Sequence, residues 1–182
     1  GITGQMPLRG IHSVTVPGAV DGWAALLKRF GRKTMPEVLA PAIRYAEDGF
    51  PVTEMVAGRW EAQVNVEMLS KLPPAAALYL PNGRPLHTGE VFRNPDLAAS
   101  LKLIATQGRD AFYKGDIGRK IVAYSQEQGG AMTAADLAAY SAEWVEPIST
   151  TYHGWTVFEL PPNGQGIAAL AMLNLMERFP LG

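Results

Sequence analysis

Residues 146–176 read EPISTTYHGWTVFELPPNGQGIAALAMLNLM, and this stretch decides the fold class of the 182-residue chain. Its first half is rich in β-branched and aromatic residues, and His153-Gly154 lies between two extended runs, which is typical of a β-hairpin turn. A loop rich in proline and glycine follows. The run 167–176 is apolar on nearly every helical face, and such a helix is normally buried on all sides. The stretch therefore predicts a β-hairpin followed by a buried helix.

The sequence upstream of this stretch carries the signals of several helices. Large apolar residues repeat at helical spacing before Gly31, which is expected to end the first helix. These residues are Trp23, Leu26, Leu27 and Phe30. A second helix is expected to begin after Thr34, which can form a capping box with Glu37. Pro41 lies inside this pattern and predicts a kink or break, and Gly49 is expected to end the helix in a left-handed conformation.

The middle of the chain carries weaker signals. We expect a third helix over residues 52–72, with Thr53 as its cap and the two prolines at 73 and 74 as its end. Residues 75–95 contain many turn-forming residues and predict an irregular connector, with a short extended piece around Leu78–Leu80. No internal repeat interrupts this pattern.

Several further helices are expected before residue 140. An amphipathic helix begins at Asp96, and its apolar face is expected to contain Leu97, Leu101 and Ile104. Residues 108–130 predict one short and one longer helix. The last of these helices is short and capped by Thr133, with Asp136 at its third position.

The predicted fold class is α+β and predominantly helical. Residues 11–140 are expected to form a helical part, and residues 141–182 are expected to form the hairpin and its core helix. Both belong to a single segment, residues 1–182, because no low-complexity stretch separates them.

The composition excludes several classes of protein. Hydrophobic residues make up 47% and charged residues 18%, which favours a packed core over disorder. The net charge of -1 and a pI near 6.3 argue against binding to nucleic acid or to an acidic membrane surface. The absence of cysteine excludes disulfides, thiolate zinc sites and a cysteine nucleophile. No apolar run approaches the ~20 residues of a membrane-spanning helix.

The usual catalytic motifs give no lead. The three histidines are far apart in sequence and lack the spacing of a metal site: His12, His87 and His153. The carboxylates form no pair in contrasting environments, and neither a G-x-S-x-G elbow nor a phosphate-binding loop is present. Thr150-Thr151 can be read as a nucleophile, but strand propensity favours an ordinary place in the hairpin. These motifs therefore identify no candidate catalytic residue and predict no metal site.

The loop before the apolar helix is the candidate binding site. Asn163 and Gly164 can adopt left-handed backbone angles, so that Gln165 and Gly166 present unpaired N–H groups at the start of the helix. Such a site suits a carboxylate or a developing oxyanion, because the helix dipole and the free amides both favour negative charge. The alternative is a strand-to-helix turn with an ordinary cap, and composition alone leaves both interpretations open.

Taken together, the sequence resembles the γ-glutamyltransferases, also called glutathione hydrolases. SVTVPGAVDGW at residues 13–23 and APAIRYAEDGFPV at residues 40–52 are similar to two segments of this family. Residues 94–140 and residues 146–177 match further family segments in the same order. The resemblance covers residues 11–178, and its collinearity makes it specific.

The resemblance implies an N-terminal-nucleophile hydrolase with an αββα core. In such enzymes the precursor cleaves itself into a large and a small subunit, and the new N-terminal threonine of the small subunit attacks a γ-glutamyl amide. A γ-glutamyl-enzyme intermediate then passes to water or to an acceptor amine. The superfamily also includes acylases with the same nucleophile.

The resemblance also implies that the catalytic residues lie outside this chain. The nucleophilic threonine and the oxyanion hole are expected beyond Gly182, and the arginine that binds the substrate carboxylate is expected before Gly1. The chain is then a piece of the large subunit. Its expected partners are the small catalytic subunit, the rest of the large subunit and a small γ-glutamyl substrate, with no cofactor. Because its apolar helix would lack a partner, the isolated chain is expected to self-associate.

One departure leaves the substrate open. Many characterised transferases read P-P-P-S-S-G-G where this chain has PPNGQG at residues 161–166. The parent protein is therefore interpreted as a γ-glutamyltransferase or, alternatively, as an acylase that acts on a different amide. A non-catalytic helical interaction domain is the third alternative. The compartment stays open between the bacterial periplasm and the cytoplasm, since relatives occur in both.

Overall fold

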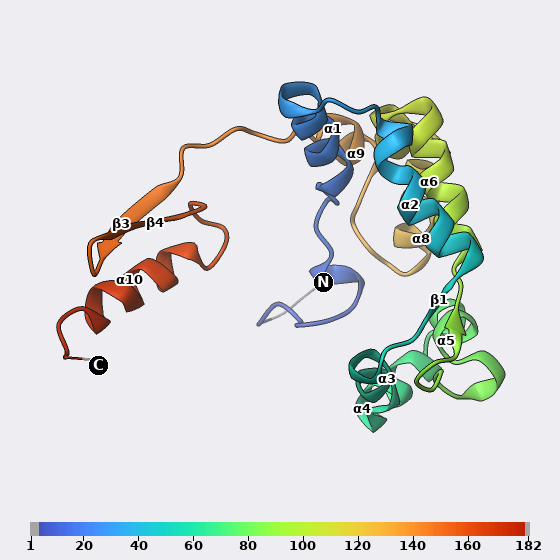
Figure 1. The fold of residues 1–182 in the computed structure, drawn as a ribbon. Coiled ribbons are helices and arrows are strands. Elements are labelled where there is room, and N and C mark those ends of the chain that lie inside the picture. Colours follow the sequence, from blue (N-terminus) through green and yellow to red (C-terminus); the bar gives the residue numbers. More distant parts are fainter. Residues whose placement is uncertain (1–3, 181–182) are drawn as a thin grey trace. The chain divides into compact units, whose positions relative to one another are not determined.

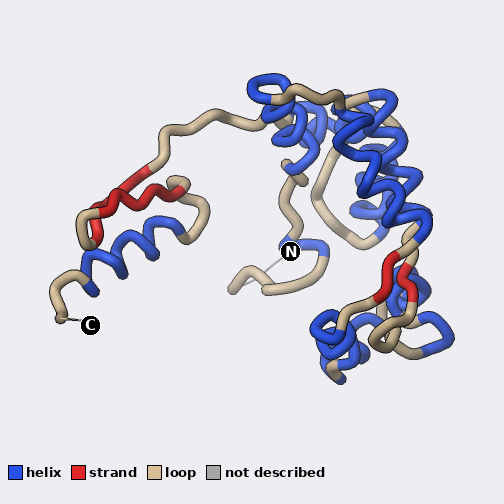
Figure 2. Tube along the Cα trace, in the orientation of Figure 1, coloured by secondary structure: helices blue, strands red, loops and turns tan. Residues whose placement is uncertain are grey.

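The computed structural model describes residues 4–180, and it divides the chain into two compact units. Unit 1 is Gly1–Ser141 and unit 2 is Ala142–Gly182. The described residues are mostly helical and contain two small antiparallel sheets, as Figures 1 and 2 show. The prediction of a predominantly helical α+β chain with a late β-hairpin is confirmed at this level. None of the helices within residues 4–180 is long and apolar enough to cross a bilayer.

Unit 1 contains nine α-helices among its described residues. Their bounds are α1 (Ala19–Phe30), α2 (Met35–Asp48), α3 (Glu54–Glu61), α4 (Gln63–Ser70), α5 (Pro73–Tyr79), α6 (Pro95–Gln107), α7 (Arg109–Tyr113), α8 (Asp116–Glu127) and α9 (Ala134–Ala139). Two 3-10 turns, Ile11–Ser13 and Pro81–Gly83, complete the helical structure.

Helix starts in unit 1 follow the local capping signals. The capping box of α2 forms as predicted, with the Thr34 N–H donating to Glu37 Oε2 at 2.7 Å. The same arrangement starts α9, where the Thr133 N–H donates to Asp136 Oδ2 at 2.8 Å. In each box the cap and the third helical residue satisfy each other's backbone N–H groups at the helix start. Because these bonds involve only neighbouring residues, they form wherever the sequence provides them.

Pro41 does not break α2, so of the predicted kink or break the break is wrong. The helix is continuous from Met35 to Asp48 with Pro41 inside it. Pro41 lies on the exposed face, so water can hydrogen-bond the Glu37 carbonyl that loses its helical N–H partner. Gly49 follows with a positive φ of 89°, as expected for the residue after the helix.

The third predicted helix is two helices, because α3 and α4 are separated at Ala62. Ala62 has an extended conformation, with φ -55° and ψ 125°. The Asn65 side-chain amide donates to the Arg59 carbonyl, and it thereby takes the acceptor that a continuous helix would offer to residue 63. Thr53 caps α3 as predicted, since its Oγ1 accepts from the Val56 N–H.

The irregular connector predicted for residues 75–95 is also corrected. Pro73 stands at the start of α5, a position where the missing proline N–H costs nothing. Leu78 and Tyr79 lie in this helix and Leu80 caps its end, so Leu78–Leu80 is not the predicted extended piece. The extended residues are instead β2 (Val91–Phe92), which pairs antiparallel with β1 (Phe50–Pro51).

A small aromatic cluster packs around this short sheet. Phe92 is buried, and its ring lies 5.1 Å from Trp60 and 5.6 Å from Tyr79, measured between centroids. Val52 and Ala57 complete the buried centre of the cluster. The cluster connects α3 and α5 to the sheet.

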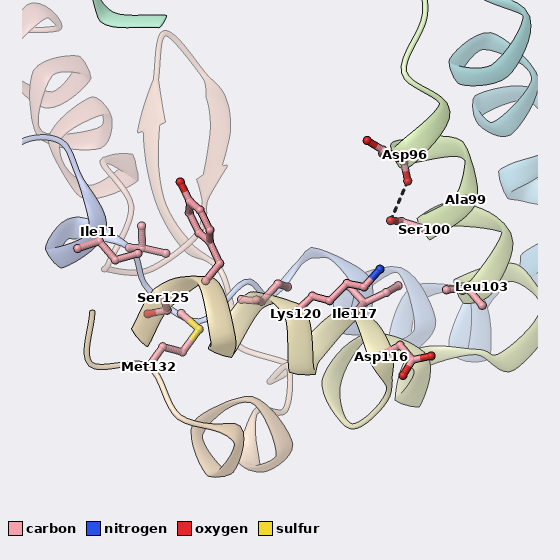
Figure 3. A pocket seen from close by; sticks show the side chains of 13 residues that line it. Ile11, Asp96, Ala99, Ser100, Leu103, Asp116, Ile117, Lys120, Ser125 and Met132 are labelled. Atoms are coloured by element: carbon pink, nitrogen blue, oxygen red, sulfur yellow. Dashed lines mark hydrogen bonds between the residues drawn. The ribbon is translucent and has the colours of Figure 1, made fainter. Parts of the chain in front are cut away.

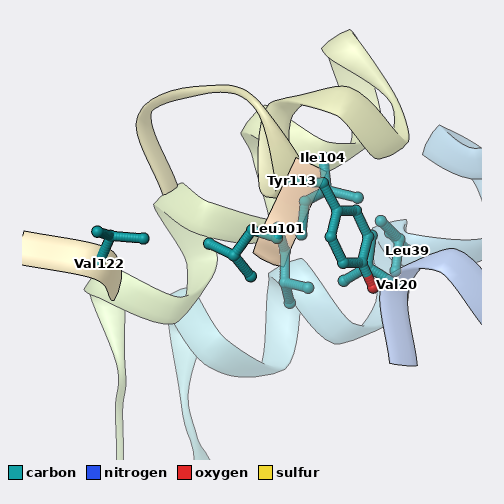
Figure 4. Packing of buried hydrophobic residues seen from close by; sticks show 7 residues of the cluster. Val20, Leu39, Leu101, Ile104, Tyr113 and Val122 are labelled. Atoms are coloured by element: carbon teal, nitrogen blue, oxygen red, sulfur yellow. The ribbon is translucent and has the colours of Figure 1, made fainter. Parts of the chain in front are cut away.

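The main core of unit 1 lies where α2 packs along α6, and Figure 4 shows six of its residues labelled. The core contains Val20, Leu39, Leu101, Ile104, Tyr113, Val122 and Leu137. On α6 the buried face is Ala98, Leu101 and Ile104. Leu101 and Ile104 are buried as predicted, whereas Leu97 is 47% exposed and Ala98 takes the remaining place on the buried face.

Unit 2 is a β-hairpin with one helix packed on it. β3 (Ile148–Tyr152) and β4 (Trp155–Glu159) pair antiparallel, with Thr150 opposite Val157. The turn residues His153 and Gly154 have φ values of 46° and 82°, which confirms the predicted hairpin turn.

The helix of unit 2 is α10 (Gly166–Met176). It contacts both strands of the hairpin, but only Leu170 is buried among its described residues. Three of its large apolar side chains are more than half exposed: Ile167, Met172 and Leu175. The prediction of a buried helix is therefore not met within this chain, because one hairpin face covers only one side of a helix that is apolar all round.

Candidate functional site

The four predicted site residues lie together in the loop that connects β4 to α10. Asn163, Gly164 and Gln165 are exposed, and Gly166 is half-buried as the first residue of the helix. Neither Asn163 nor Gly164 has a positive φ, so the predicted left-handed angles are wrong. The loop turns the chain with ordinary backbone angles, because Gln165 takes near-helical values of -92° and 10° before α10 begins.

The start of α10 presents free backbone donors. The Gln165 carbonyl accepts from the N–H groups of Ala168 and Ala169, at 3.0 and 3.2 Å. The N–H groups of Gly166 and Ile167 have no hydrogen-bond acceptor among residues 4–180, and no side chain caps the helix. No acidic residue lies in the first turn. An anion or a developing oxyanion would find two donors and the positive end of the helix dipole there.

Gly166 is fixed by its close approach to the end of β4. A Cβ at this position would lie 2.7 Å from the Leu160 carbonyl oxygen and 2.7 Å from Glu159 Cβ, which is closer than real side chains approach. Gly164 has no neighbour within 4 Å of the corresponding position. Gly166 therefore has a packing role, whereas Gly164 leaves the loop surface open.

The Glu159 side chain is a member of this site that the sequence analysis missed. Its Oε2 would lie 3.1 Å from a Cβ at Gly166, which places the carboxylate beside the first turn of α10. A carboxylate in this position is stabilised by the helix dipole. It also adds negative charge where a substrate carboxylate would otherwise bind. No local signal in the sequence indicates this contact, because it depends on how α10 packs against the end of β4.

The hairpin is tied to α10 by polar contacts as well. Thr150 Oγ1 donates to Asn174 Oδ1, and the His153 N–H donates to Glu177 Oε1 at 2.9 Å. Thr150 is thus a strand residue engaged in a structural hydrogen bond, and Thr151 is its exposed neighbour in β3. Asn174 was also missed, although it is a lone polar residue within the apolar run.

The other candidates from the sequence do not form a second site. His87 Nδ1 lies 2.7 Å from Glu61 Oε1 in an exposed pair of unit 1, and His153 is the hairpin turn residue. Within residues 4–180, no three His, Cys, Asp or Glu side chains are grouped so that they could hold a metal ion.

A partly buried polar network of unit 1 surrounds Arg109. The Arg109 guanidinium pairs with the Asp21 carboxylate and donates to the Tyr140 carbonyl, and its Cζ lies 4.5 Å from the Tyr113 ring centroid. The Tyr113 hydroxyl donates to the Pro17 carbonyl at 2.8 Å. The hydrogen bond to Asp21 raises the pKa of Arg109, and burial raises the pKa of Tyr113. The network connects α1, α7 and the end of α9.

Among the described residues, the start of α10 offers two backbone donors that can stabilise negative charge. The Arg109 network is fully engaged in holding helices together.

Comparison with known proteins shows which family the sequence matches. The family model described as Gamma-glutamyltranspeptidase matches residues 2–182. The chain is 43% identical over 175 residues to the Glutathione hydrolase-like YwrD proenzyme of Bacillus subtilis (strain 168), and the match covers 96% of this chain and 33% of that protein. It is 42% identical over 174 residues to the Acylase ACY 1 proenzyme of Pseudomonas sp. (strain SE83), where the match covers 95% and 31%.

A solved structure has a similar fold. The crystal structure of cephalosporin acylase from Bacillus halodurans is similar with a TM-score of 0.87 and 41% identity, and the match covers 95% of this chain and 33% of that chain. The chain thus spans about a third of the length of the curated relatives it matches.

Proposed function

This chain belongs to the gamma-glutamyltranspeptidase family, and from that premise we propose that it is part of the large subunit of a self-cleaving amide hydrolase. The observation that carries the proposal is the match over residues 2–182, combined with coverage of only a third of relatives that are named proenzymes. In this proposal the segment contributes one wall of an αββα core and of the substrate cleft, and the parent protein supplies the reacting groups.

The proposed reaction is acyl transfer from an amide. The N-terminal threonine of the small subunit attacks the amide carbonyl, and its own α-amino group takes the hydroxyl proton. The amine leaves with that proton, and an acyl ester of the threonine remains. Water or an acceptor amine then releases the acyl group. The threonine and its oxyanion hole are expected outside residues 1–182, so the isolated chain is expected to be inactive.

The loop 163–166 is proposed to line the cleft. The free N–H groups of Gly166 and Ile167 would face the polar part of the acyl group, and the exposed amides of Asn163 and Gln165 would add hydrogen bonds. The Glu159 carboxylate would favour an acyl group that carries an ammonium or a neutral donor on that side, because a second carboxylate there would be repelled.

Two substrate classes fit this site. The first is a γ-glutamyl amide of the glutathione type, as the family implies. The second is the amide of another acyl group, supported by two proteins named acylase at 41–42% identity, while the glutathione hydrolase-like relative at 43% identity supports the first. The PPNGQG loop is consistent with the second class, since it lacks the two serines of many characterised transferases.

A substrate panel tests the proposal. The full-length parent is expected to split into two chains on a denaturing gel, and replacement of the threonine at the new N-terminus by alanine is expected to abolish both splitting and turnover. Hydrolysis of γ-glutamyl anilides supports the first class, whereas hydrolysis of other acyl amides alone supports the second. Amide hydrolysis by purified residues 1–182 would contradict the proposal.

The loop role needs a separate measurement in the parent. Gln165→Ala is expected to raise KM about 5-fold, the effect of one lost hydrogen bond, with a smaller change in kcat. The matched control is Gln63→Ala, an exposed glutamine of α4 whose side-chain amide donates to Glu67. Equal kinetics for both variants would exclude a contact between residue 165 and the substrate.

The exposed face of α10 supports the proposed partners. Ile167, Met172 and Leu175 would pack against the remainder of the large subunit or against the small subunit. The isolated chain is expected to self-associate through this face, which sedimentation at increasing concentration would detect. A monomer at high concentration would argue against this surface as an interface.

A further inference from the structure

A groove on unit 1 lies apart from the loop described above. It has a volume of about 730 Å³ and is formed by α6 and α8, with Ile11 and Val14 of the N-terminal segment at one end. Figure 3 shows it open, with α8 along its floor. We call it the α6–α8 groove. A groove of this size is larger than a packing defect, so we consider what could bind in it.

The lining of the groove has helical spacing on both sides. Ala99 and Leu103 are four residues apart on α6, and Ile117, Ile121 and Tyr124 follow one face of α8. Leu103, Ile117 and Ile121 are half-buried, while Ala99 and Tyr124 are exposed. Two such apolar rows form the kind of surface into which the side chains of a third helix pack. A loop or a small polar molecule would leave these rows in water.

The polar groups of the groove define the charge of the occupant. Lys120 has no ion-pair or hydrogen-bond partner among residues 4–180, and Ser125 is only 4% exposed and has no partner for its hydroxyl there. The acidic lining residue Asp116 pairs with Arg119 instead. Asp96 lies in the first turn of α6, where the helix dipole stabilises its carboxylate.

The remaining polar lining residue is already satisfied. Ser100 Oγ donates to the Asp96 carbonyl at 2.9 Å, the bond drawn in Figure 3. Lys120, Tyr124 and Ser125 are therefore the three lining side chains that still have free donors among the described residues, and Lys120 is the charged one. The occupant needs acceptors for them, and a carboxylate is the acceptor that an ammonium group prefers.

We propose that an amphipathic helix of the parent protein, located before Gly1 in sequence, fills the α6–α8 groove and places an Asp or Glu side chain against Lys120. This inference rests on the proposed function, since it requires that residues 1–182 are part of a longer chain. The length of that chain supports it, because the relatives are about three times as long as the segment they share with it.

The position of the N-terminal segment argues for this particular occupant. Ile11 and Val14 already form one end of the groove, so the chain that precedes them is the nearest sequence to it.

Single-cysteine labelling in the full-length parent tests whether the groove is filled. Residues 1–182 contain no cysteine, so Ala99→Cys introduces one thiol into this part of the protein, and mass spectrometry assigns its reaction with a maleimide. The thiol at position 99 is expected to react about 100-fold more slowly in the native parent than in denaturant, as for a site that must open to react. Ala123→Cys, on an exposed part of α8 outside the groove lining, is the matched control and is expected to react freely.

Fast labelling of the Ala99→Cys variant in the native parent overturns the proposal. Equally slow labelling at positions 99 and 123 also overturns it, since protection would then not be specific to the groove. Self-cleavage and amide hydrolysis are measured on the same preparations. A parent that cleaves and turns over substrate while the thiol at position 99 reacts freely refutes the groove proposal alone, and a parent without either activity refutes the proposed function.

A zero-length crosslink identifies the occupant. A carbodiimide joins a carboxylate to a lysine amine only when the two are in contact, so Lys120 is expected to link to an acidic residue before Gly1. A link to a peptide after Gly182 would overturn the proposal. A link between isotopically light and heavy copies of the parent would overturn it as well, because the occupant would then be a second copy.

Discussion

Unit 1 and unit 2 differ in how much of their own apolar surface they bury. Unit 1 encloses a seven-residue core in which α2 packs along α6, although its helices are amphipathic. In unit 2 the most apolar helix of the chain, α10, has Leu170 as its one buried residue among those described. The hydrophobicity of a helix therefore does not decide its burial. The number of elements that can pack against it within the same chain does.

A pair of core truncations gives the largest expected effect and sharpens this comparison. Leu137→Ala in unit 1 is expected to lower the free energy of unfolding by about 3 kcal/mol, because Leu137 is only 1% exposed and the cavity cannot close fully. Met172→Ala on α10, at 59% exposure, is expected to change it by less than about 0.5 kcal/mol. Urea unfolding of the chain, followed by circular dichroism, measures both.

The same pair in the parent protein can break the comparison. If α10 is covered there, Met172→Ala should cost about 2 kcal/mol, which approaches a core substitution. An unchanged, negligible cost in the parent would mean that this side of α10 is exposed in the complete protein too, and the proposed interface would be wrong.

The Arg109 network supplies the second prediction. Arg109→Met leaves the Asp21 carboxylate, which is 11% exposed, without its guanidinium partner, and it is expected to cost about 2 kcal/mol. The partial exposure of Arg109, 25%, keeps the loss below that of a fully buried pair. The double variant Arg109→Met/Asp21→Asn should recover part of this loss, since the negative charge that the guanidinium neutralised is then removed as well. Additive losses in urea unfolding would show that the two side chains are not coupled.

A glycine pair in the candidate site gives the third prediction. Gly166→Ala is expected to cost about 1–2 kcal/mol, because the new methyl group would overlap the Leu160 carbonyl at the end of β4. Gly164→Ala is the matched control, since it meets no atom within 4 Å and its φ is not positive. Hydrogen exchange of the α10 amides measures the local effect. Similar protection in both variants would show that the strand end and the helix are not in close contact.

The parts of the fold that depend on neighbouring residues could be predicted from the sequence. The capping boxes at Thr34 and Thr133 and the turn at His153-Gly154 act over two to four residues, and all three formed as expected. The break at Ala62 depends on one side chain, Asn65, that competes for a helical carbonyl. The helix propensity of Asn65 alone did not indicate that its side chain would do so.

The parts that depend on distant residues could not be predicted. The pairing of Phe50 with Phe92 brings together residues far apart in the sequence, and no local pattern specifies it. In the candidate site the location of the loop could be predicted from composition. The Glu159 carboxylate beside Gly166 could not, because it depends on how α10 packs back onto β4.

The smallest expected effect is a pH dependence of stability, which should arise in unit 1 rather than in unit 2. In unit 1 the hydrogen bonds from Arg84 and from the His87 N–H lower the pKa of Glu90 from 4.5 to about 2. A lowered folded-state pKa means that the stabilisation is complete above the unfolded value and is lost as the pH falls from 4.5 towards 2. The pair is exposed, so the effect should be modest.

Glu90→Gln isolates this contribution. The wild-type chain is expected to lose more thermal stability between about pH 5 and about pH 2 than the variant does, and the difference should concern the loop between residues 84 and 92. Calorimetric melting at several pH values measures the loss of thermal stability. Hydrogen exchange resolved by region shows whether the difference lies in the loop. Arg84→Gln should behave like Glu90→Gln, because either change removes the same ion pair. If the wild type and both variants lose the same thermal stability over this pH range, the ion pair between Arg84 and Glu90 makes no measurable contribution to the stability of unit 1.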